Sequence, residues 1–212
     1  MLILTFSQNQ MNFVSFKNSL RDFPVFSLVD IRATHAGFDR RRLSEWQNKG
    51  YIKKIVKGHY FFSDVEMNED TLWAIANKIY KPSYISFETA MSHYRLIPES
   101  IYMMTSASTK RTSIFETTLA RFSYRTIKPA LFFGYSLLPG RIKMAFMEKA
   151  IIDYFYINPA AQTDADFASL RINREELLAQ VNEERLMDYL QRFDQKRLSK
   201  RMQHFLEWLN RS

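Results

Sequence analysis

The first part of the chain carries apolar residues at helical spacing. Phe13, Phe16, Leu20 and Phe23 recur every three or four positions, which predicts an amphipathic helix over residues 11–23 with these side chains packed inward. A proline follows directly and cannot continue a helix. The next two residues, a valine and a phenylalanine, fit a short extended link.

Two more helices are expected after this link. Ser27 can cap a second helix, and Gly37 fits the position at which that helix would end. Asp39 is a suitable N-cap for a third helix that would continue through Lys49, and Gly50 would stop it. The spacing therefore predicts two helices joined by a turn.

A short hairpin is predicted immediately after the third helix. Residues 51–56 and 59–62 are rich in β-branched and aromatic side chains, and Lys57 and Gly58 between them suit a tight turn. Helix, helix, turn, helix and hairpin is the order of a winged helix-turn-helix domain. We therefore assign residues 1–65 to a winged helix-turn-helix domain that binds DNA.

A polar, acidic segment at 63–69 separates this domain from residues 66–212, the second predicted domain. Helices are expected there at 70–80, 86–95 and 147–156, and alternation from Ile101 to Ala145 predicts several strands. From about residue 160 the chain becomes a charged helical tail with an apolar stripe. The predicted fold class is α+β: an N-terminal winged helix-turn-helix followed by a mixed α/β C-terminal domain with a helical tail.

The third predicted helix has an apolar and a polar face. At about 100° per residue, Leu43 and Trp46 fall on one side, where they can bind the helix to a core, and Gln47 lies partly toward them. An arginine on the opposite side could bond a guanine edge bidentately in the major groove. The hairpin could lie along the phosphate backbone or the minor groove. The predicted DNA-contacting residues are Arg40, Arg41, Arg42, Ser44, Gln47 and Asn48 on the helix, and Lys53, Lys54, Lys57 and His59 on the hairpin.

The charge of the chain favours a polyanionic partner. Its formal net charge is +8 and its pI is about 9.6, which fits nucleic acid, an acidic protein or an anionic membrane. Residues 38–60 hold seven lysines and arginines against two acids. An arginine-rich helix face on its own is more often a solvated surface, so the order of helix and basic hairpin carries the prediction. Binding of this kind would depend strongly on salt.

Composition sets the broad class of the protein. The chain has 212 residues, 46% of them hydrophobic and 15% aromatic, which is ample for packed cores. It has no cysteine, so disulfides, thiolate zinc sites and cysteine nucleophiles are excluded. The N-terminal segment lacks the basic start of a signal peptide, and no stretch approaches the roughly 18 apolar residues of a membrane span. A cytoplasmic setting without a membrane partner is expected.

Catalytic and cofactor sites find little support in the sequence. Glu148, Lys149 and Asp153 could form an acid–base site, but Lys149 and Asp153 are four residues apart on a predicted helix and fit an ordinary ion pair. The four histidines lack metal-ligand spacing, and no phosphate-binding glycine motif is present. We expect no enzyme activity, cofactor or metal, although an enzyme in the second domain stays an open alternative.

The middle of the chain is also basic. Its cations are Lys110, Arg111, Arg121, Arg125, Lys128, Arg141 and Lys143. Alternation would place Arg121, Ser123 and Arg125 on one face of a strand and two aromatic side chains on the other. This face is either solvated or a second surface for nucleic acid or a partner. The long helical tail is expected to pack in a core, and it could also support a homodimer on palindromic DNA.

The ordered motifs of the chain resemble a known family. The winged-helix domain of AbiEi-type antitoxins, also described as predicted transcriptional regulators of viral defence systems, is similar to the stretch HAGFDRRRLSEWQNKGYIKKIVKGHYFF. The family's C-terminal domain is similar to four later stretches in their order, SYISFETAMSHYRLIPE, MMTSASTKRT, RFSYRTIKPALFFGY and KMAFMEKAIIDYFYINP. The resemblance covers about residues 10–160 and lies in the ordered combination of loose motifs.

This resemblance implies the antitoxin of a type IV toxin–antitoxin system that acts in abortive infection, a form of phage defence. Such a protein would bind inverted repeats of double-stranded DNA at its own promoter, with 39–49 as recognition helix and 51–62 as wing. Its C-terminal domain would counter a nucleotidyltransferase-like toxin, directly or only functionally. Two alternatives stay open: a protein-interaction module, and a stand-alone transcriptional regulator without a toxin.

Overall fold

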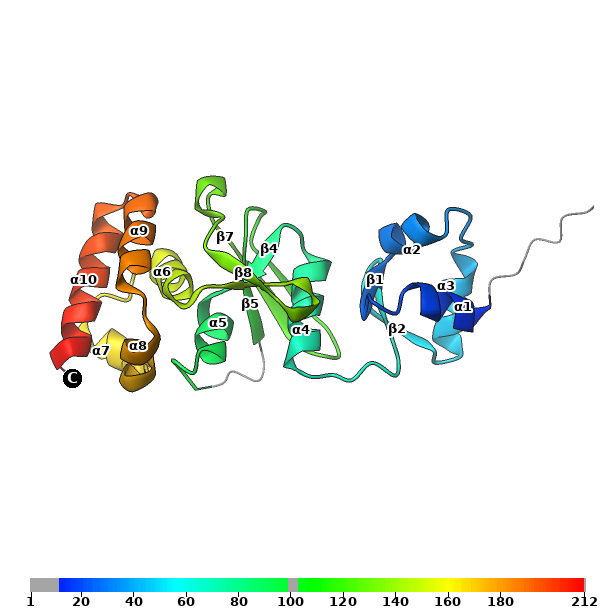
Figure 1. Cartoon of the computed structure of the whole chain (residues 1–212), viewed down its shortest axis with the longest axis horizontal. Helices are drawn as coiled ribbons and strands as arrows, with labels where there is room; N and C mark the ends of the chain where they lie inside the picture. Colours follow the sequence, from blue (N-terminus) through cyan, green and yellow to red (C-terminus); the bar gives the residue numbers. More distant parts are fainter. Residues whose placement is uncertain (1–11, 99–102, 212) are drawn as a thin grey trace, which may run out of the picture. The chain divides into compact units, whose positions relative to one another are not determined.

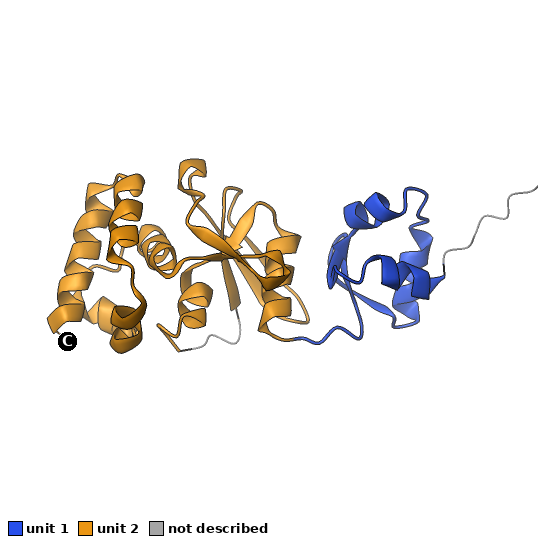
Figure 2. Ribbon diagram, viewed as in Figure 1, with its two compact units in different colours: residues 1–67 blue, residues 68–212 orange. Residues whose placement is uncertain are grey.

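The computed structural model describes residues 12–98 and 103–211 (Figure 1). They form a mixed α+β structure that divides into two compact units, Met1–Met67 and Asn68–Ser212 (Figure 2). The predicted helix position Met11, the predicted strand position Ile101 and the N-terminal segment considered as a signal peptide lie outside the described residues. None of the described helices combines the length and the apolar character needed to cross a membrane.

Over residues 12–67, the described part of unit 1, three helices combine with a small antiparallel sheet. Its elements are α1 (Phe13–Ser19), β1 (Val25–Ser27), α2 (Leu28–Thr34), α3 (Arg41–Asn48), β2 (Ile52–Val56) and β3 (His59–Phe62). The strands lie in the order β1-β3-β2, so the hairpin β2–β3 uses β1 as its third strand and leaves β2 at an edge.

The core of unit 1 is built mainly from aromatic and branched side chains that are at most 3% exposed. They are Phe16, Leu20, Phe26, Ile31, Leu43, Trp46, Ile52 and Phe62. The rings of Phe16 and Trp46 lie 4.5 Å apart and join α1 to α3. Phe23 was predicted to pack inward but is 42% exposed. Because α1 ends at Ser19, this phenylalanine no longer follows the helical phase.

The ends of α2 show which local signals fixed the helix. Ser27 caps it as predicted, with Asp30 N donating to its Oγ and its own backbone N–H donating to the Asp30 carboxylate in a capping box. The prediction for Gly37 was wrong, because α2 already stops at Thr34. Thr34 Oγ1 donates to the carbonyl of Ile31 at 3.0 Å, and a bond of this kind competes with continuation of the helix.

Unit 2 is built around a six-stranded mixed sheet. Its strands are β4 (Ser83–Ile85), β5 (Met103–Ser108), β6 (Ser113–Glu116), β7 (Arg121–Thr126), β8 (Tyr135–Leu138) and β9 (Ile142–Ala145). They lie in the order β6-β7-β5-β4-β9-β8, with β5 parallel to β7, β4 parallel to β9 and the other pairs antiparallel. Two 3-10 turns, η1 (Pro129–Leu131) and η2 (Pro139–Arg141), flank β8.

Seven helices are described in unit 2, and the last four of them form the C-terminal tail. They are α4 (Glu69–Ile79), α5 (Phe87–His93), α6 (Met147–Ile157), α7 (Asp164–Ser169), α8 (Arg174–Gln180), α9 (Glu183–Phe193) and α10 (Lys196–Arg211). Helix α6 packs on α5 and β9 on one side and on α9 and α10 on the other (Figure 1). It therefore joins the sheet to the helical tail.

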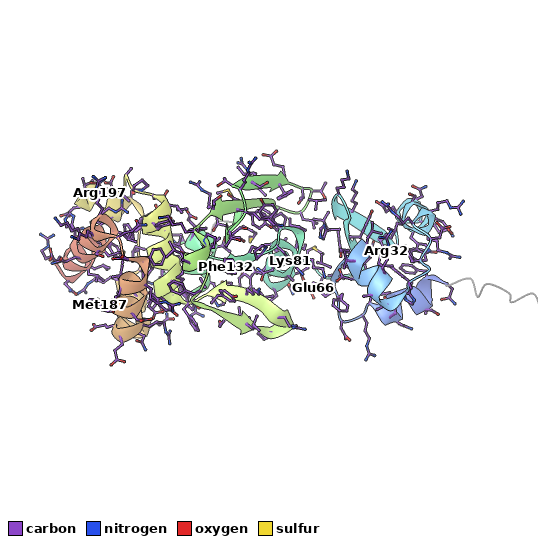
Figure 3. The ribbon with its side chains drawn as sticks, turned by 90° about the horizontal axis from the view of Figure 1, so that it is seen from above. Arg32, Glu66, Lys81, Phe132, Met187 and Arg197 are labelled. Carbon is purple, nitrogen blue, oxygen red and sulfur yellow. The ribbon has the colours of Figure 1, made fainter. Side chains whose placement is uncertain are left out.

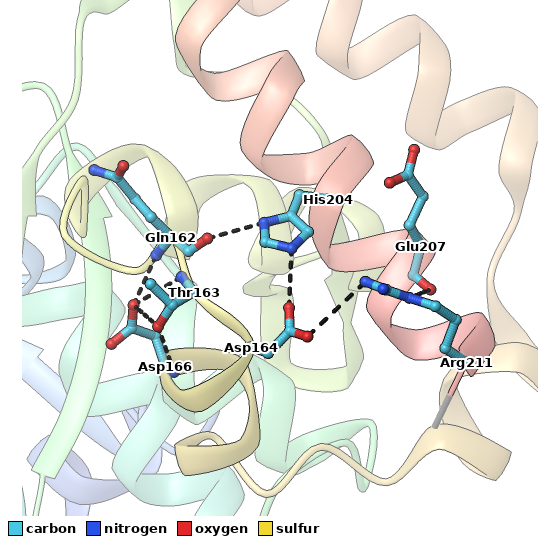
Figure 4. Close-up of polar contacts among 7 residues, drawn as sticks. All are labelled: Gln162, Thr163, Asp164, Asp166, His204, Glu207 and Arg211. Carbon is cyan, nitrogen blue, oxygen red and sulfur yellow. Dashed lines mark hydrogen bonds and ion pairs between the residues drawn. The ribbon is translucent and has the colours of Figure 1, made fainter.

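Polar contacts fix the last helix to the chain before it. Arg201 donates to the carbonyl oxygens of Phe155 and Pro159 at 2.8 Å each and so satisfies one acceptor in the last turn of α6 and one just after the helix. The two ring nitrogens of His204 lie 2.9 Å from the Gln162 carbonyl oxygen and 2.9 Å from Asp164 Oδ1 (Figure 4). These contacts hold α10 against the segment that leads into α7.

Candidate nucleic-acid interface

Helix α3 is anchored from one side. Leu43 and Trp46 are 3% and 2% exposed, as predicted, and the Trp46 ring also approaches that of Phe13 at 5.4 Å in edge geometry. Gly50 ends the helix at φ +72°, with its own N–H donating to Gln47 O and that of Tyr51 donating to Trp46 O. This is a Schellman motif, which requires a left-handed residue at the glycine position. The predicted stop at Gly50 is confirmed.

The start of α3 is organised by Asp39. The helix begins at Arg41, one residue later than predicted. Arg41 N donates to Asp39 Oδ1 at 2.9 Å, and Arg41 Nε donates to Asp39 Oδ2 at 3.0 Å. Hydrogen bonds from the backbone and then the side chain of Arg41 hold the pKa of Asp39 below its ordinary value, and Asp39 raises the pKa of Arg41. The predicted N-cap Asp39 is therefore wrong, because the N-cap is Arg40 and no side chain caps it. The Asp39 carboxylate lies one residue earlier, where it accepts the first helical N–H and orients the Arg41 side chain.

A second ion pair lies at the C-terminal half of α3. Arg40 is exposed, and Arg42 is half-buried. Glu45 accepts from Lys49 Nζ at 2.7 Å, and this bond, more than the nearby charge of Arg42, lowers the pKa of Glu45. Both partners of that pair are about half exposed, so it contributes little to stability.

The three uncharged polar residues predicted to contact DNA differ in how exposed their side chains are. Ser44 and Asn48 are exposed on the outer side of α3. Gln47 is half-buried, and its Nε2 donates to the carbonyl of Leu43 at 3.0 Å within the same helix. The helical wheel predicts that Gln47 faces partly inward, and the structure confirms this.

The hairpin β2–β3 displays its lysines on an edge strand and a turn. Lys53 and Lys54 of β2 and Lys57 of the turn are exposed, whereas His59 is half-buried with Nδ1 at 3.4 Å from the Lys57 carbonyl oxygen. Lys54 pairs with Tyr60 but Val56 pairs with His59, so the register shifts in between. Such an irregularity bends a strand and increases its twist.

The cations of α3 and the hairpin therefore lie on short, anchored elements. Within the part of the chain that the structure describes, no acidic side chain pairs with Arg40, Lys53, Lys54 or Lys57. Cations without such a partner can exchange their counterions for phosphates. This surface, formed by α3 and β2–β3, can accept a polyanion.

The candidate acid–base residues of unit 2 lie in its interior. Lys149 and Asp153 are fully buried and paired with each other. Lys149 Nζ donates to Tyr84 Oη at 2.7 Å, and both Tyr84 Oη and Ser86 Oγ donate to Asp153 Oδ2 at 2.8 Å. Burial lowers the pKa of Lys149 and raises that of Asp153, while their mutual attraction opposes both shifts. The predicted ion pair is confirmed, and it lies within the protein core.

Aromatic rings enclose this buried pair. The Lys149 ammonium lies 4.9 Å from the ring centroid of Phe193 and 5.1 Å from that of Phe133. Phe132, labelled in Figure 3, meets the Tyr84 ring edge-on at 5.1 Å. The arrangement joins α6 to β4 and to the helical tail, which is a structural role.

Glu148 is held by the start of α9. Although only 1% exposed, it accepts from the backbone N–H of Asn182 at 2.8 Å and from Arg185 at 3.3 Å, and so fixes the start of α9. Across residues 12–98 and 103–211, no three His, Asp or Glu side chains are grouped so that they could hold a metal ion.

A second basic surface lies at one edge of the large sheet. Because β5 and β7 are parallel and in register to their ends, the exposed Lys110 and Arg111 after β5 lie at the same edge as Arg125 and Lys128 of the β7 end. Ser123 was predicted to share the outer face with the arginines but is 6% exposed. The sheet is covered on both sides at this strand, so alternation alone does not give exposure.

Comparison with known proteins shows the fold alone. No family model matches the chain, and no curated protein matches it. The chain is similar to the crystal structure of the RV2827C protein from Mycobacterium tuberculosis, with a TM-score of 0.60 at 15% sequence identity. The match covers 92% of this chain and 75% of that one. The mixed α+β architecture is therefore shared with a protein of very different sequence.

Proposed function

We propose that the chain is a sequence-specific, DNA-binding transcriptional regulator whose first unit is a winged helix-turn-helix domain. In this proposal α2 and α3 are the paired helices, α3 enters the major groove, and the hairpin β2–β3 is the wing. One observation carries the proposal. Buried Leu43 and Trp46 hold α3 from behind, while its outer side and the adjoining hairpin display exposed cations.

The dimensions of α3 fit such a role. A helix with its side chains is about 10–12 Å across, which matches the roughly 12 Å width of the major groove. The eight residues of α3 form a rod about 12 Å long at 1.5 Å per residue. Arg41, Ser44 and Asn48 lie on its exposed side and could reach base edges. Lys53, Lys54 and Lys57 would meet phosphates, and phosphate contacts fix register without reading sequence.

The biological role proposed here is that of an antitoxin. The ordered motifs similar to AbiEi-type antitoxins support a cytoplasmic protein of a type IV toxin–antitoxin system that represses its own promoter and counters a nucleotidyltransferase-like toxin. A homodimer on inverted repeats belongs to the same proposal. Co-expression with the adjacent open reading frame tests it: the pair should restore growth that the neighbour alone stops, and continued arrest would contradict the antitoxin role.

The DNA-binding part is tested by fluorescence anisotropy of the full chain with a duplex from the promoter of its own gene. The double variant Arg41→Ala with Arg42→Ala should lose binding by at least 100-fold while its melting temperature stays close to that of the wild type. The matched control is Lys196→Ala with Arg197→Ala, which removes the same charge from an exposed turn of α10 and should bind almost normally.

Each other outcome has a definite meaning. Unchanged binding by the α3 variant would refute α3 as the DNA-reading element. Equal losses in both double variants would reduce the interaction to net charge. No affinity for DNA at moderate salt, together with a stably co-purifying protein, would favour a protein-interaction module instead.

A further inference from the structure

We propose that Asp39 is a specificity-positioning residue: it holds the Arg41 guanidinium so that the two terminal amino groups of Arg41 read a guanine edge. The inference rests on the proposed entry of α3 into the major groove. It assigns one base preference, a G·C pair, to one arginine of the triplet. It also gives Asp39 a role beyond its bond to the first backbone N–H of the helix.

The contact geometry leaves only one side of the guanidinium free for DNA. Arg41 Nε lies 3.2 Å from Asp39 Oδ1 and 3.0 Å from Oδ2, so the carboxylate takes up the donor nearest the side-chain stem. A guanidinium has five N–H donors in a planar fork. With Nε engaged, the four N–H groups on the two terminal nitrogens remain, and they can meet O6 and N7 of guanine in parallel.

The anchor of this contact is itself fixed. Asp39 Oδ1 also accepts the backbone N–H of Arg41 at 2.9 Å, which ties the carboxylate to the first turn of α3. The Arg41 side chain is 92% exposed while that of Asp39 is 46% exposed, so the carboxylate lies nearer the protein and the guanidinium projects into solvent. A held arginine loses less side-chain entropy on binding than a free one.

The charge of Asp39 should also discourage indiscriminate binding. A carboxylate at the rim of a basic surface repels phosphates, and it competes with them for Arg41. Asp39 would therefore weaken binding to arbitrary duplexes while it strengthens discrimination among sequences. Opposite effects on these two quantities distinguish a positioning role from a purely electrostatic one.

The test begins with a selection of binding sites from a randomised duplex library by the full chain. Affinity is then measured on three duplexes: the selected site, the selected site with its G·C pair changed, and a random sequence. The wild type should enrich a motif with one invariant guanine. Asp39→Asn keeps an oxygen to accept the backbone N–H but removes the charge. Its preference for that guanine should fall roughly tenfold, within the range of one bidentate contact, and its affinity for the random duplex should rise.

Glu45→Gln is the matched control. It removes the same charge from the same helix and likewise breaks one pair with a cation, Lys49 at 2.7 Å, but it does not contact Arg41. It should raise affinity for the random duplex and leave the guanine preference intact. Asp39→Ser also removes the charge and keeps a side-chain oxygen that can accept the N–H two residues on. It should reproduce Asp39→Asn and guards against misfolding of a single variant.

Three results would overturn the proposal. Asp39→Asn and Asp39→Ser could keep the guanine preference, in which case Asp39 only stabilises the start of the helix. Asp39→Asn and Glu45→Gln could change binding identically, in which case Asp39 acts only through charge. If the wild type enriches no motif, the proposed sequence-specific function fails and this inference fails with it.

Discussion

Replacing Lys149 by methionine should strongly destabilise unit 2. Methionine nearly preserves the length of the side chain among the rings of Phe133 and Phe193 but removes the ammonium. Asp153 would then remain in the interior with two neutral donors, Tyr84 and Ser86, and no cation. Removing one partner of a buried ion pair typically costs about 3–5 kcal/mol, because it leaves an uncompensated charge.

The size of the effect can be checked against a double variant. Lys149→Met with Asp153→Asn retains an acceptor for Tyr84 and Ser86 and removes both charges, so it should be more stable than Lys149→Met alone. At about 2–4 °C per kcal/mol for a domain near this size, the single variant should melt roughly 6–20 °C below the wild type. The defect should also shrink at low pH. Burial raises the pKa of Asp153, so the protonated acid, which is cheaper to bury without its lysine, is favoured as the pH falls.

Calorimetry and urea unfolding of the full chain, at pH 7 and at pH 5, measure these quantities. A cost below about 1 kcal/mol for Lys149→Met would refute the assignment of this pair as a buried structural link. So would a double variant less stable than the single one. Either result would reopen the alternative in which these groups carry chemistry.

Three further predictions concern packing and titration. Gly134→Ala should destabilise unit 2 more than Gly140→Ala, although both glycines have φ near +70°. An added Cβ at Gly134 would lie 3.0 Å from two side chains, whereas at Gly140 the nearest atom is 3.9 Å away. Overpacking adds about 1–3 kcal/mol, and equal melting temperatures of the two variants would contradict this prediction. Trp46→Ala should cost about 3–5 kcal/mol and abolish the unfolding transition of unit 1 in calorimetry, whereas Val29→Ala, at a side chain 76% exposed, should leave that transition in place. Burial lowers the pKa of His93 in the folded protein, so the unfolded chain takes up a proton at this residue more readily. Stability should therefore decline as the pH falls below the ordinary histidine pKa near 6.5. The decline should be smaller in His93→Phe, and the same pH profile of melting temperatures in both proteins would contradict the reasoning.

Much of unit 1 could be predicted because its signals are local. The serine cap of α2, the glycine that ends α3 and the apolar pair Leu43 and Trp46 each act within one or two turns. The predictions for Phe23 and Gly37 were wrong because each assumed that a helix continues further than it does. Helix α1 ends at Ser19 and α2 ends at Thr34, before the residues in question.

The arrangement of unit 2 depends on contacts that leave no local pattern. Strand β4 pairs with β9, far along the chain, through Ile85 and Met144, and no feature of either segment specifies the other. The ion pair of Lys149 and Asp153 followed from their spacing. Its full burial did not, although the apolar residues between them were a usable signal.

In the candidate interface, the sequence showed which side chains could face outward but not how they are held. Asp39 is predicted as the N-cap of α3, but the N-cap is Arg40. The bond of Asp39 to the Arg41 side chain depends on how the chain enters α3 and leaves no helical pattern. A carboxylate two residues before an arginine at a helix start is a signal that could have suggested this contact. The partly inward position of Gln47, whose side chain bonds the Leu43 carbonyl of the same helix, could be predicted from the helical wheel.

The most direct test of DNA binding through α3 and the hairpin is amide hydrogen exchange of the full chain, with and without a duplex from its own promoter. The account predicts slowed exchange within residues 39–60, and no such change with Arg41→Ala and Arg42→Ala together. Protection confined to residues 68–212, or no protection at saturating DNA, would contradict it.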